Sequence, residues 1–255
     1  MNYLIGVDVG TSSTKAVLYD QNAQVITQAN YGYELHRNAA GMAEQEPEEV
    51  INAAEQAIHD VARAADLSTG KLLAVSISSA NQSLLLLDKD KKPLSRLITW
   101  ADSRAQRAAD NLKMMTEGQQ LYMKTGVPVH PMSTLTKLLW LREDEPNLFS
   151  RTAYFADIKA YLFYRLFNEF KVDMSIASST GLMNLKTCDW DDQALRVAGI
   201  TKDQLPEIVD GTTQVTGLVP EAKKNLEYPL IRHLSMALTM VPFQILVLVR
   251  PSKIQ

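Results

Sequence analysis

Two apolar strands joined by a short polar turn open the sequence, and they constrain the fold more than any other feature. The strands are expected over residues 3–9 and 15–19, and the turn between them has one glycine followed by Thr11, Ser12 and Ser13. Apolar side chains recur through this part of the chain with the alternation of half-buried strands. The pattern predicts a β-hairpin at the start of a larger sheet.

The elements that follow predict an α/β domain. A third strand is expected over residues 25–33, and Pro47 opens a helix at a position that proline favours. Compact apolar strands are then expected at residues 72–78 and 83–87. Further along, helices are expected over residues 105–115, 135–142, 158–167 and 191–198. Three strands, a helix and another strand are the order of a ribonuclease-H-like half-domain, the unit of actin-like ATPases and sugar kinases. We therefore expect a mixed sheet flanked by helices.

Composition narrows the class of protein. The 255 residues carry a net charge of -3 without a stripe of lysine or arginine, which argues against a nucleic-acid partner. The most apolar stretch, residues 236–249, is shorter than the roughly 20 residues of a membrane span. A single cysteine, Cys188, precludes an internal disulfide and fits a reducing compartment. We expect a cytoplasmic globular protein with neither a nucleic-acid nor a membrane partner.

The turn after residue 9 has the composition of a phosphate-binding turn. Gly10 lets the backbone approach a ligand closely, and the N–H groups and hydroxyls that follow can cradle phosphate oxygens. Asp8 is expected to hold Mg²⁺ through water, because this ion keeps several waters and needs few carboxylates. The candidate phosphate and Mg-ATP residues are Asp8, Gly10, Thr11, Ser12, Ser13 and Lys15. The alternative is an ordinary glycine-containing hairpin, since D-x-G-T alone is short and common.

Five short motifs, in the same order, resemble the FGGY family of carbohydrate kinases, which phosphorylate gluconate, xylulose, glycerol and related compounds with ATP. The motifs lie at residues 6–20, 41–47, 98–104, 137–140 and 173–178, and they include W-x-D-x-R, K-x-x-W and D-x-S-x-A-S. The resemblance implies two domains around a cleft, of which the N-terminal one binds the sugar and the C-terminal one supplies most of the nucleotide site. It also implies ATP and Mg²⁺ as cofactors, and a sugar acid or polyol as the small-molecule partner.

The resemblance further implies which residues lie near the sugar. Trp100 is expected to stack on a sugar face, while Asp102 and Arg104 hydrogen-bond hydroxyls or a carboxylate. Residues two apart share a face of an extended segment, which supports this grouping. The candidate substrate-binding residues are Asn81, Gln82, Trp100, Asp102, Arg104 and Asp173. Two alternatives stay open: a surface Asp–Arg pair beside a core tryptophan, and an Asp173 that only caps the segment after it.

Several segments are most similar to gluconokinases, but one position departs from them. Gluconate- and xylulose-type members are expected to have Met-His after Ala80, where this chain has Asn81 and Gln82. Asn-Gln is similar to the glycerol-kinase pattern, although the Arg-Glu expected after it is absent. Gluconate therefore leads, with xylulose, glycerol or another polyol as the alternative substrate. We interpret His130 as a structural loop residue and Cys188 as unreactive.

The end of the chain does not continue the resemblance. Family members next have a G-A-x-D-G-A motif, whose Asp is the catalytic base, whereas residues 231–255 form an apolar tail. Methionine has the single codon ATG and alanine begins with GC, so a shifted frame across Met236 and Ala237 reads GGC, which is glycine. We interpret the tail as this motif read out of frame. The competing explanation is a genuine apolar strand.

This interpretation sets the expected domain organisation. Residues 1–230 are expected to form the sugar-binding domain, and the C-terminal nucleotide domain is expected to be absent. The expected base lies in the missing region, so no catalytic residue is assigned in this chain. A chain without that base and without a rigid ATP site is expected to be inactive, or nearly so, on its own.

Two other classes of function stay open as alternatives. One is a non-catalytic remnant that only binds sugar weakly, and the other is an actin- or chaperone-like ATPase, which shares the phosphate turn. The motifs at residues 100–104 and 173–178 argue against the ATPase, because it has no polyol to hold. The residues leave the oligomeric state open, a homodimer included.

Overall fold

The computed structural model describes residues 2–66, 68, 70–226 and 237–240. The strands are β1 (Asn2–Val9), β2 (Ser13–Asp20), β3 (Val25–Gly32), β4 (His36–Arg37), β5 (Ala43–Gln45), β6 (Lys71–Ser79), β7 (Leu85–Leu87), β8 (Leu97–Ile98), β9 (Tyr154–Ala156), β10 (Lys171–Asp173), β11 (Met183–Asn184), β12 (Asp189–Trp190), β13 (Glu207–Val209), β14 (Gln214–Val215) and β15 (Ala237–Met240). The α-helices are α1 (Pro47–Ala62), α2 (Gln106–Lys113), α3 (Thr116–Thr125), α4 (Thr134–Asp144), α5 (Pro146–Arg151), α6 (Ile158–Phe167), α7 (Met174–Ser179), α8 (Asp192–Ala198) and α9 (Pro220–Asn225).

The main sheet has six strands in the order β14-β15-β6-β1-β2-β3. β1, β6 and β15 run parallel to one another, whereas β2 and β3 continue from β1 as antiparallel neighbours. The sheet is therefore mixed, as the order of elements predicts. Because β1 and β6 are parallel, their carboxyl ends meet at one edge, and there Asp8 lies beside Ser78 in the register.

One face of this sheet forms the core with α1, which packs across β1, β2 and β3. Alternate residues of β1 point into this core, with Ile5, Val7 and Val9 almost fully buried. The facing side chains of α1 recur three or four residues apart, which places them on one stripe. They are Val50, Ile51, Ala54, Ala57, Ile58 and Val61. The hydrophobic period of each element thus matches its structure.

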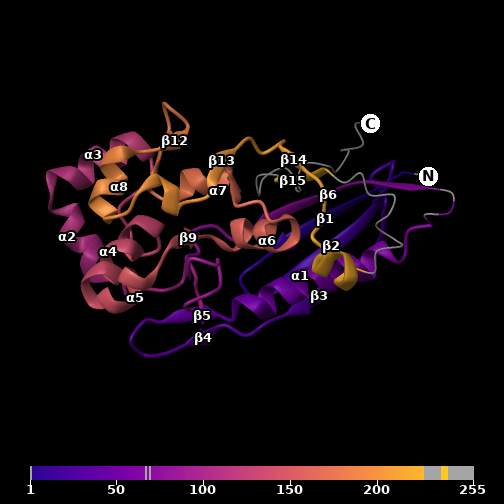
Figure 1. Cartoon of the computed structure of the whole chain (residues 1–255), viewed down its shortest axis with the longest axis horizontal. Helices are drawn as coiled ribbons and strands as arrows, with labels where there is room; N and C mark the ends of the chain where they lie inside the picture. Colours follow the sequence, from indigo (N-terminus) through magenta and orange to yellow (C-terminus); the bar gives the residue numbers. More distant parts are fainter. Residues whose placement is uncertain (1, 67, 69, 227–236, 241–255) are drawn as a thin grey trace, which may run out of the picture.

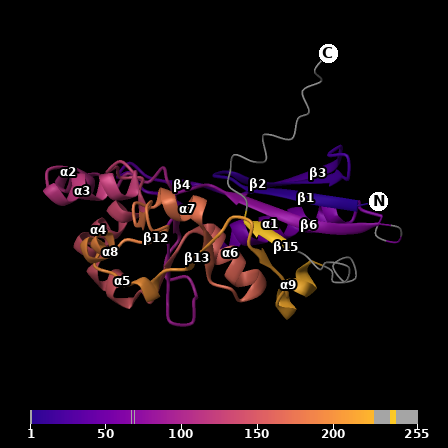
Figure 2. The ribbon, with the colours of Figure 1, turned by 90° about the horizontal axis from the view of Figure 1, so that it is seen from above.

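The two ends of the molecule differ in structure. The main sheet lies at the end that carries the N-terminus, and α2 to α5 and α8 gather at the opposite end (Figures 1 and 2). Between these ends, β7 pairs with β9, and β5 pairs with both β4 and β8. The small sheets thus connect the strand-rich end to the helical end, and they adjoin the carboxyl end of β1, where the candidate site lies.

Several element boundaries differ from those expected. The helix over residues 158–167 is as predicted, and Asp157 caps it, whereas β7 is shorter than expected and contains only Leu85–Leu87. The short helices α3, α5, α7 and α9 were not expected. Of the predicted apolar tail, residues 237–240 form β15 between β6 and β14. The rest of the tail lies outside the described residues, so the out-of-frame interpretation stays a prediction.

In the part of the chain that the structure describes, no helix combines the length and the apolar character that crossing a bilayer requires.

The cap of α6 makes stability depend on pH. Asp157 accepts hydrogen bonds from the N–H groups of Lys159 and Ala160, at 2.7 and 3.1 Å, yet burial raises the pKa of its carboxyl to about 6. Between pH 4 and 6 the folded chain therefore holds a proton that the unfolded chain has lost, so stability falls as pH rises through this window.

We expect Asp157→Asn to keep the cap and remove this loss. The free energy of unfolding of the variant, relative to the unchanged chain, should rise by about 2–3 kcal/mol between pH 4 and 7 in urea titrations. Asp191→Asn is the matched control. Asp191 caps α8, and although burial alone would raise its pKa, hydrogen bonds from Asn184 and Ala194 hold that pKa below the usual value. Because the pKa of Asp191 is lowered, its contribution to stability changes mainly below pH 4, so the control should stay almost constant between pH 4 and 7; a rise in both variants would contradict the assignment.

Candidate functional site

The turn between β1 and β2 is fixed from several sides. The Gly10 N–H donates to the Ser13 carbonyl at 3.0 Å, which closes the turn. The Tyr33 hydroxyl donates to the Gly10 carbonyl at 2.6 Å. From β5, the buried side-chain amide of Gln45 donates to the Thr11 carbonyl at 2.7 Å. These bonds occupy the carbonyls of the turn and leave its conformation set before any ligand arrives.

Gly10 is required by the close approach of the backbone within this turn. A Cβ at this position would lie 3.0 Å from the Ser13 carbonyl oxygen, which is closer than ordinary van der Waals contact. Because that oxygen is a backbone atom, it cannot move away without distorting the turn. A larger residue would therefore change the shape of the surface that the turn presents.

Asp8 is the only carboxylate among the residues predicted to bind phosphate, and its neighbours are well defined. The Ser78 hydroxyl of β6 donates to Asp8 Oδ1 at 2.9 Å. In the register, Asp8 lies opposite Ser78 on one side and opposite Lys15 on the other. Residues directly opposite each other on neighbouring strands share a face of the sheet. The carboxylate and the lysine side chain of this turn therefore emerge on the same face.

All six residues predicted to bind phosphate and Mg²⁺ line one open hollow of about 590 Å³, which β3 completes with Gln28, Ala29 and Asn30. Its walls supply hydroxyls, one carboxylate and one ammonium group. This donor set fits Mg²⁺ held largely through water, since the ion takes oxygen ligands and tolerates few carboxylates. Within the described residues, no three His, Cys, Asp or Glu side chains gather into a group that could hold a metal ion directly.

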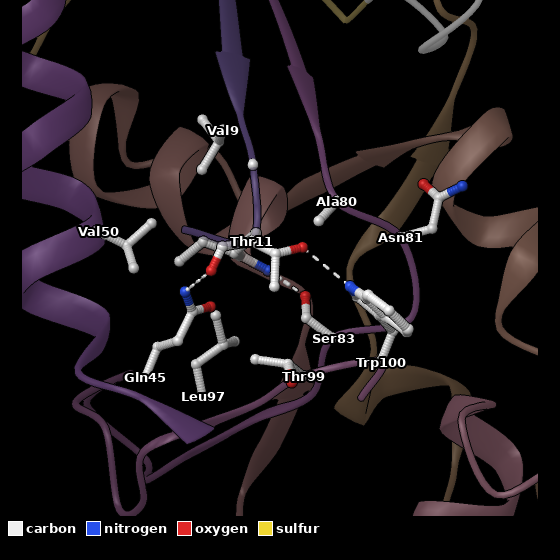
Figure 3. Close-up of a pocket in the computed structure, with 12 residues that line it drawn as sticks. Val9, Thr11, Gln45, Val50, Ala80, Asn81, Ser83, Leu97, Thr99 and Trp100 are labelled. Carbon is white, nitrogen blue, oxygen red and sulfur yellow. Dashed lines mark hydrogen bonds between the residues drawn. The ribbon is translucent and has the colours of Figure 1, made fainter. Parts of the chain in front are cut away.

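A second, much smaller cavity of about 10 Å³, room for about one water, adjoins the same turn (Figure 3). Its lining residues are Val9, Gly10, Thr11, Gln45, Val50, Ala80, Asn81, Ser83, Leu97, Thr99, Trp100 and Ile158. Thr11 lies at its centre in Figure 3, and the indole Nε1 of Trp100 donates to its hydroxyl Oγ1 at 2.9 Å. Gly10 and Thr11 line both hollows, so the phosphate turn and the Trp100 segment meet at one place.

The prediction that residues 100–104 form an extended segment with one shared face is wrong. The Asp102 N–H donates back to the Thr99 carbonyl at 3.2 Å, so the segment is a turn. As a result Trp100 is 45% exposed, whereas Asp102 is 2% exposed and points inward. The alternative of a core tryptophan beside a surface Asp–Arg pair is wrong too, because Trp100 is exposed and Asp102 is buried.

Asp102 and Arg104 form an inward network rather than a free pair. Asp102 Oδ2 accepts from the Ala43 N–H at 2.9 Å and from Arg104 Nη2 at 2.8 Å. The Arg104 guanidinium also binds Glu44 and lies 4.4 Å from the centre of the Trp140 ring. This network ties β5 to the turn that carries Trp100, so its effect on the cavity acts through the backbone.

Asp173 has the capping role that was left open as an alternative. It is fully buried, and its Oδ1 accepts from the N–H groups of Ser175 and Ile176, at 3.0 and 3.3 Å, as the N-cap of α7. Its other oxygen, Oδ2, lies 2.7 Å from the ammonium group of Lys159, which is also buried. Asp173 is absent from the lining of the cavity.

The two residues that depart from the family pattern have different surroundings. Asn81 is exposed and lines the cavity. Gln82 turns away from it, since its amide Nε2 donates to the Ser179 carbonyl at 3.2 Å. His130 accepts from the Met132 N–H at 3.2 Å within its own loop, and Cys188 is an exposed free thiol. Of the departing pair, only Asn81 is therefore placed to meet a ligand.

Four residues that shape the site were not among those predicted to form it. Gln45 lies inside the motif at residues 41–47, so a signal for it was present. Lys137 begins the K-x-x-W motif, but nothing in the motif indicates what its ammonium contacts. The sequence indicates Ser78 and Tyr33 only as members of expected strands. Their hydrogen bonds to Asp8 and Gly10 come from the strand register, which sequence reasoning did not provide.

Comparisons with known proteins show the family to which the chain is similar. Residues 3–231 match the N-terminal domain of the FGGY family of carbohydrate kinases. The chain is 41% identical over 221 residues to a gluconokinase of Bacillus subtilis (strain 168), which covers 86% of the chain and 42% of that protein. A xylulose kinase of the same organism is 32% identical over 222 residues, which cover 86% of the chain and 44% of that protein. The crystal structure of gluconate kinase from Lactobacillus acidophilus superposes with a TM-score of 0.88 at 36% identity, covering 94% of the chain and 48% of that structure. The chain thus spans less than half the length of these relatives.

Proposed function

The chain belongs to the FGGY family of carbohydrate kinases, and on this premise we propose that it forms the sugar-binding part of a kinase that transfers phosphate from ATP to gluconate or a related sugar or polyol. One observation carries the proposal: Thr11 lines both hollows and accepts a hydrogen bond from Trp100. A phosphoryl donor on one side of the turn and a sugar on the other would meet there, and transfer between bound groups depends mainly on such positioning.

The phosphate side of the proposal uses the turn after β1. Backbone N–H groups and hydroxyls of Thr11, Ser12 and Ser13 bind phosphate oxygens, and Lys15 adds a positive charge. Asp8, oriented by Ser78, holds the water shell of Mg²⁺. When Mg²⁺ is bound, it neutralises part of the negative charge of the phosphates.

The sugar side uses the exposed face of Trp100 and the side chain of Asn81. The indole is 45% exposed while its N–H is held by Thr11, so the ring is oriented and still accessible. An oriented, accessible aromatic ring suits stacking against the apolar face of a sugar. Asp102 and Arg104 support this surface from behind, and Asp173 supports the fold.

The proposal extends to substrate and compartment. Gluconate is the leading substrate, because gluconokinases are the more similar relatives at 41% and 38% identity, compared with 32% for a xylulose kinase. A cytoplasmic location fits the single free thiol of Cys188. Xylulose and glycerol are the alternative substrates and enter the test below.

We expect millimolar gluconate to raise the melting temperature of the chain more than xylulose or glycerol does. A ligand at 100 times its Kd stabilises by about 2.7 kcal/mol, which a thermal-shift assay detects. Trp100→Ala should weaken gluconate binding by about tenfold or more, because the stacking surface is lost. The matched control is Tyr122→Ala, which removes another half-exposed aromatic ring that does not line the cavity. Equal binding by both variants would overturn the sugar side of the proposal.

A further inference from the structure

A lysine lies fully buried beneath the turn that carries Asn81, one of the proposed sugar contacts. Lys137 is on the inner side of α4 and has no exposed surface. Its ammonium group donates to the backbone carbonyl of Gln82 at 2.5 Å. Charged lysines are seldom fully buried, because removing an ammonium ion from water is costly. A buried ammonium that binds a loop carbonyl therefore calls for a reason beyond packing.

The carbonyl that Lys137 holds belongs to the turn that carries Asn81. Gln82 adopts a left-handed backbone conformation, with φ of 61°, which is unfavourable for a side chain with a Cβ. Two neighbours fix the ends of this turn: the Ala80 N–H donates to the Val9 carbonyl at 2.8 Å, and the Ser83 hydroxyl accepts from the Ile158 N–H at 3.1 Å. Between these ends, the hydrogen bond from Lys137 restrains the residue that follows Asn81.

The same ammonium lies near the network behind Trp100. Burial lowers the pKa of Lys137 to about 7, the carboxylate of Asp102 opposes this shift, and the guanidinium of Arg104 adds to it. Arg104 is in turn bound by Glu44 of β5. Asp102 and Arg104 face Lys137 from the turn after β8, so this lysine contacts the turn that carries Asn81 and interacts electrostatically with the network behind Trp100.

We propose that Lys137 is a positioning residue for the sugar site, whose ammonium group holds the Gln82 carbonyl and thereby sets the orientation of Asn81 relative to Trp100. This inference rests on the proposed function, because it assigns a role within the sugar site. Lys137 does not touch the sugar. It fixes the backbone from which a sugar-contacting side chain projects.

The role predicts that stability and sugar binding respond to pH in opposite directions. Below pH 7 the ammonium is charged and holds the carbonyl strongly, so gluconate binding should weaken by about tenfold as pH rises from 6 to 8. Between pH 7 and about 10 the unfolded chain, in which lysine has a pKa near 10.5, binds more protons than the folded chain. Stability should therefore rise with pH over this second range. A purely structural lysine would change stability alone.

The test measures gluconate binding and melting temperature across pH for the unchanged 255-residue chain, Lys137→Met and Leu138→Met. Leu138 is the next residue of α4 and is also fully buried, so its methionine variant controls for a change of packing in this helix. Lys137→Met should raise the Kd for gluconate by about tenfold at pH 6 and remove its dependence on pH, because no charged donor holds the turn. The melting temperature of Lys137→Met should not fall in proportion to this loss of gluconate binding, since methionine avoids burying a charge.

The outcomes separate the inference from the proposed function. If the unchanged chain binds none of gluconate, xylulose and glycerol, the proposed function fails and the inference falls with it. If it binds gluconate with the same Kd from pH 6 to 8, or if Lys137→Met binds as tightly as Leu138→Met, the positioning role alone is overturned. The pH series on the unchanged chain decides the matter even if Lys137→Met does not fold.

Discussion

Asp173→Ala is expected to destabilise the chain by about 3–5 kcal/mol, the usual cost of removing one partner from a buried ion pair. The Asp173 carboxylate lies 2.7 Å from the Lys159 ammonium, and both side chains are almost completely buried. The substitution also removes the cap of α7, which Asp173 provides through the N–H groups of Ser175 and Ile176. Urea denaturation at neutral pH measures the loss as a lower midpoint with an unchanged slope.

Asp191→Ala is the matched control for this prediction. Asp191 also caps a helix, α8, but the ammonium of its partner Lys124 lies 3.4 Å away and is 40% exposed. Losing a cap and a half-exposed ion pair should cost only about 1 kcal/mol. If Asp173→Ala costs no more than this control, the buried pair does not stabilise the fold as argued.

The same variant decides between the two interpretations of the D-x-S-x-A-S motif. If Asp173 contacted sugar, alanine would abolish the thermal shift caused by gluconate and leave the unfolding free energy almost unchanged. The structure favours the opposite result, because the carboxylate is inaccessible and absent from the cavity lining. Part of a family motif can therefore belong to the scaffold of the site rather than to its surface.

The sheet could be predicted because its signals are local. The alternation in β1 and the apolar stripe of α1 each lie within one element, and Pro47 marks the start of α1 directly. The short helices could not be predicted in the same way. α5 and α7 have six residues each, too few for a hydrophobic period to repeat. Their formation depends on caps and on packing against distant parts of the chain.

The candidate site shows the same division between local and long-range information. The phosphate turn is one contiguous segment, so its residue types and their spacing were sufficient to propose it. The burial of the W-x-D-x-R segment was predicted wrongly, because a hydrogen bond between Asp102 and Thr99 makes it a turn instead of an extended strand. Lys137 and Gln82 are far apart in sequence, and only the packing of α4 brings them together.

Within the site, the W-x-D-x-R motif supplies both a contact residue and a supporting residue, and the K-x-x-W motif supplies a supporting one. Trp100 faces the cavity while Asp102, two positions later, is buried, and Lys137 supports the turn that carries Asn81. A substitution in one of these motifs can therefore weaken sugar binding in two ways. It can remove a contact, or it can loosen the backbone that holds one. Measuring stability and binding together separates the two cases.

Arg104→Met is expected to destabilise the chain by about 2–4 kcal/mol, more than a single lost hydrogen bond, because the Asp102 carboxylate stays buried without its charged partner. Arg104 is 21% exposed and donates to Asp102 from both Nε and Nη2, while Nη2 also binds Glu44. Arg104→Lys should recover only part of the loss, since one ammonium cannot reproduce the planar, two-sided contact of a guanidinium. Gluconate binding should weaken in both variants, because the turn that carries Trp100 loses its anchor to β5.

Arg107→Met provides the comparison for this last prediction. Arg107 also faces two carboxylates, Asp144 at 2.7 Å and Glu143 at 3.6 Å, but it is 63% exposed, so water replaces the lost contacts and little change in stability is expected. The two arginines thus have similar partners and differ mainly in burial. If both methionine variants unfold at the same urea concentration, the Asp102–Arg104–Glu44 network does not support the sugar site. If Arg104→Met loses stability but binds gluconate unchanged, the network stabilises the fold without orienting Trp100.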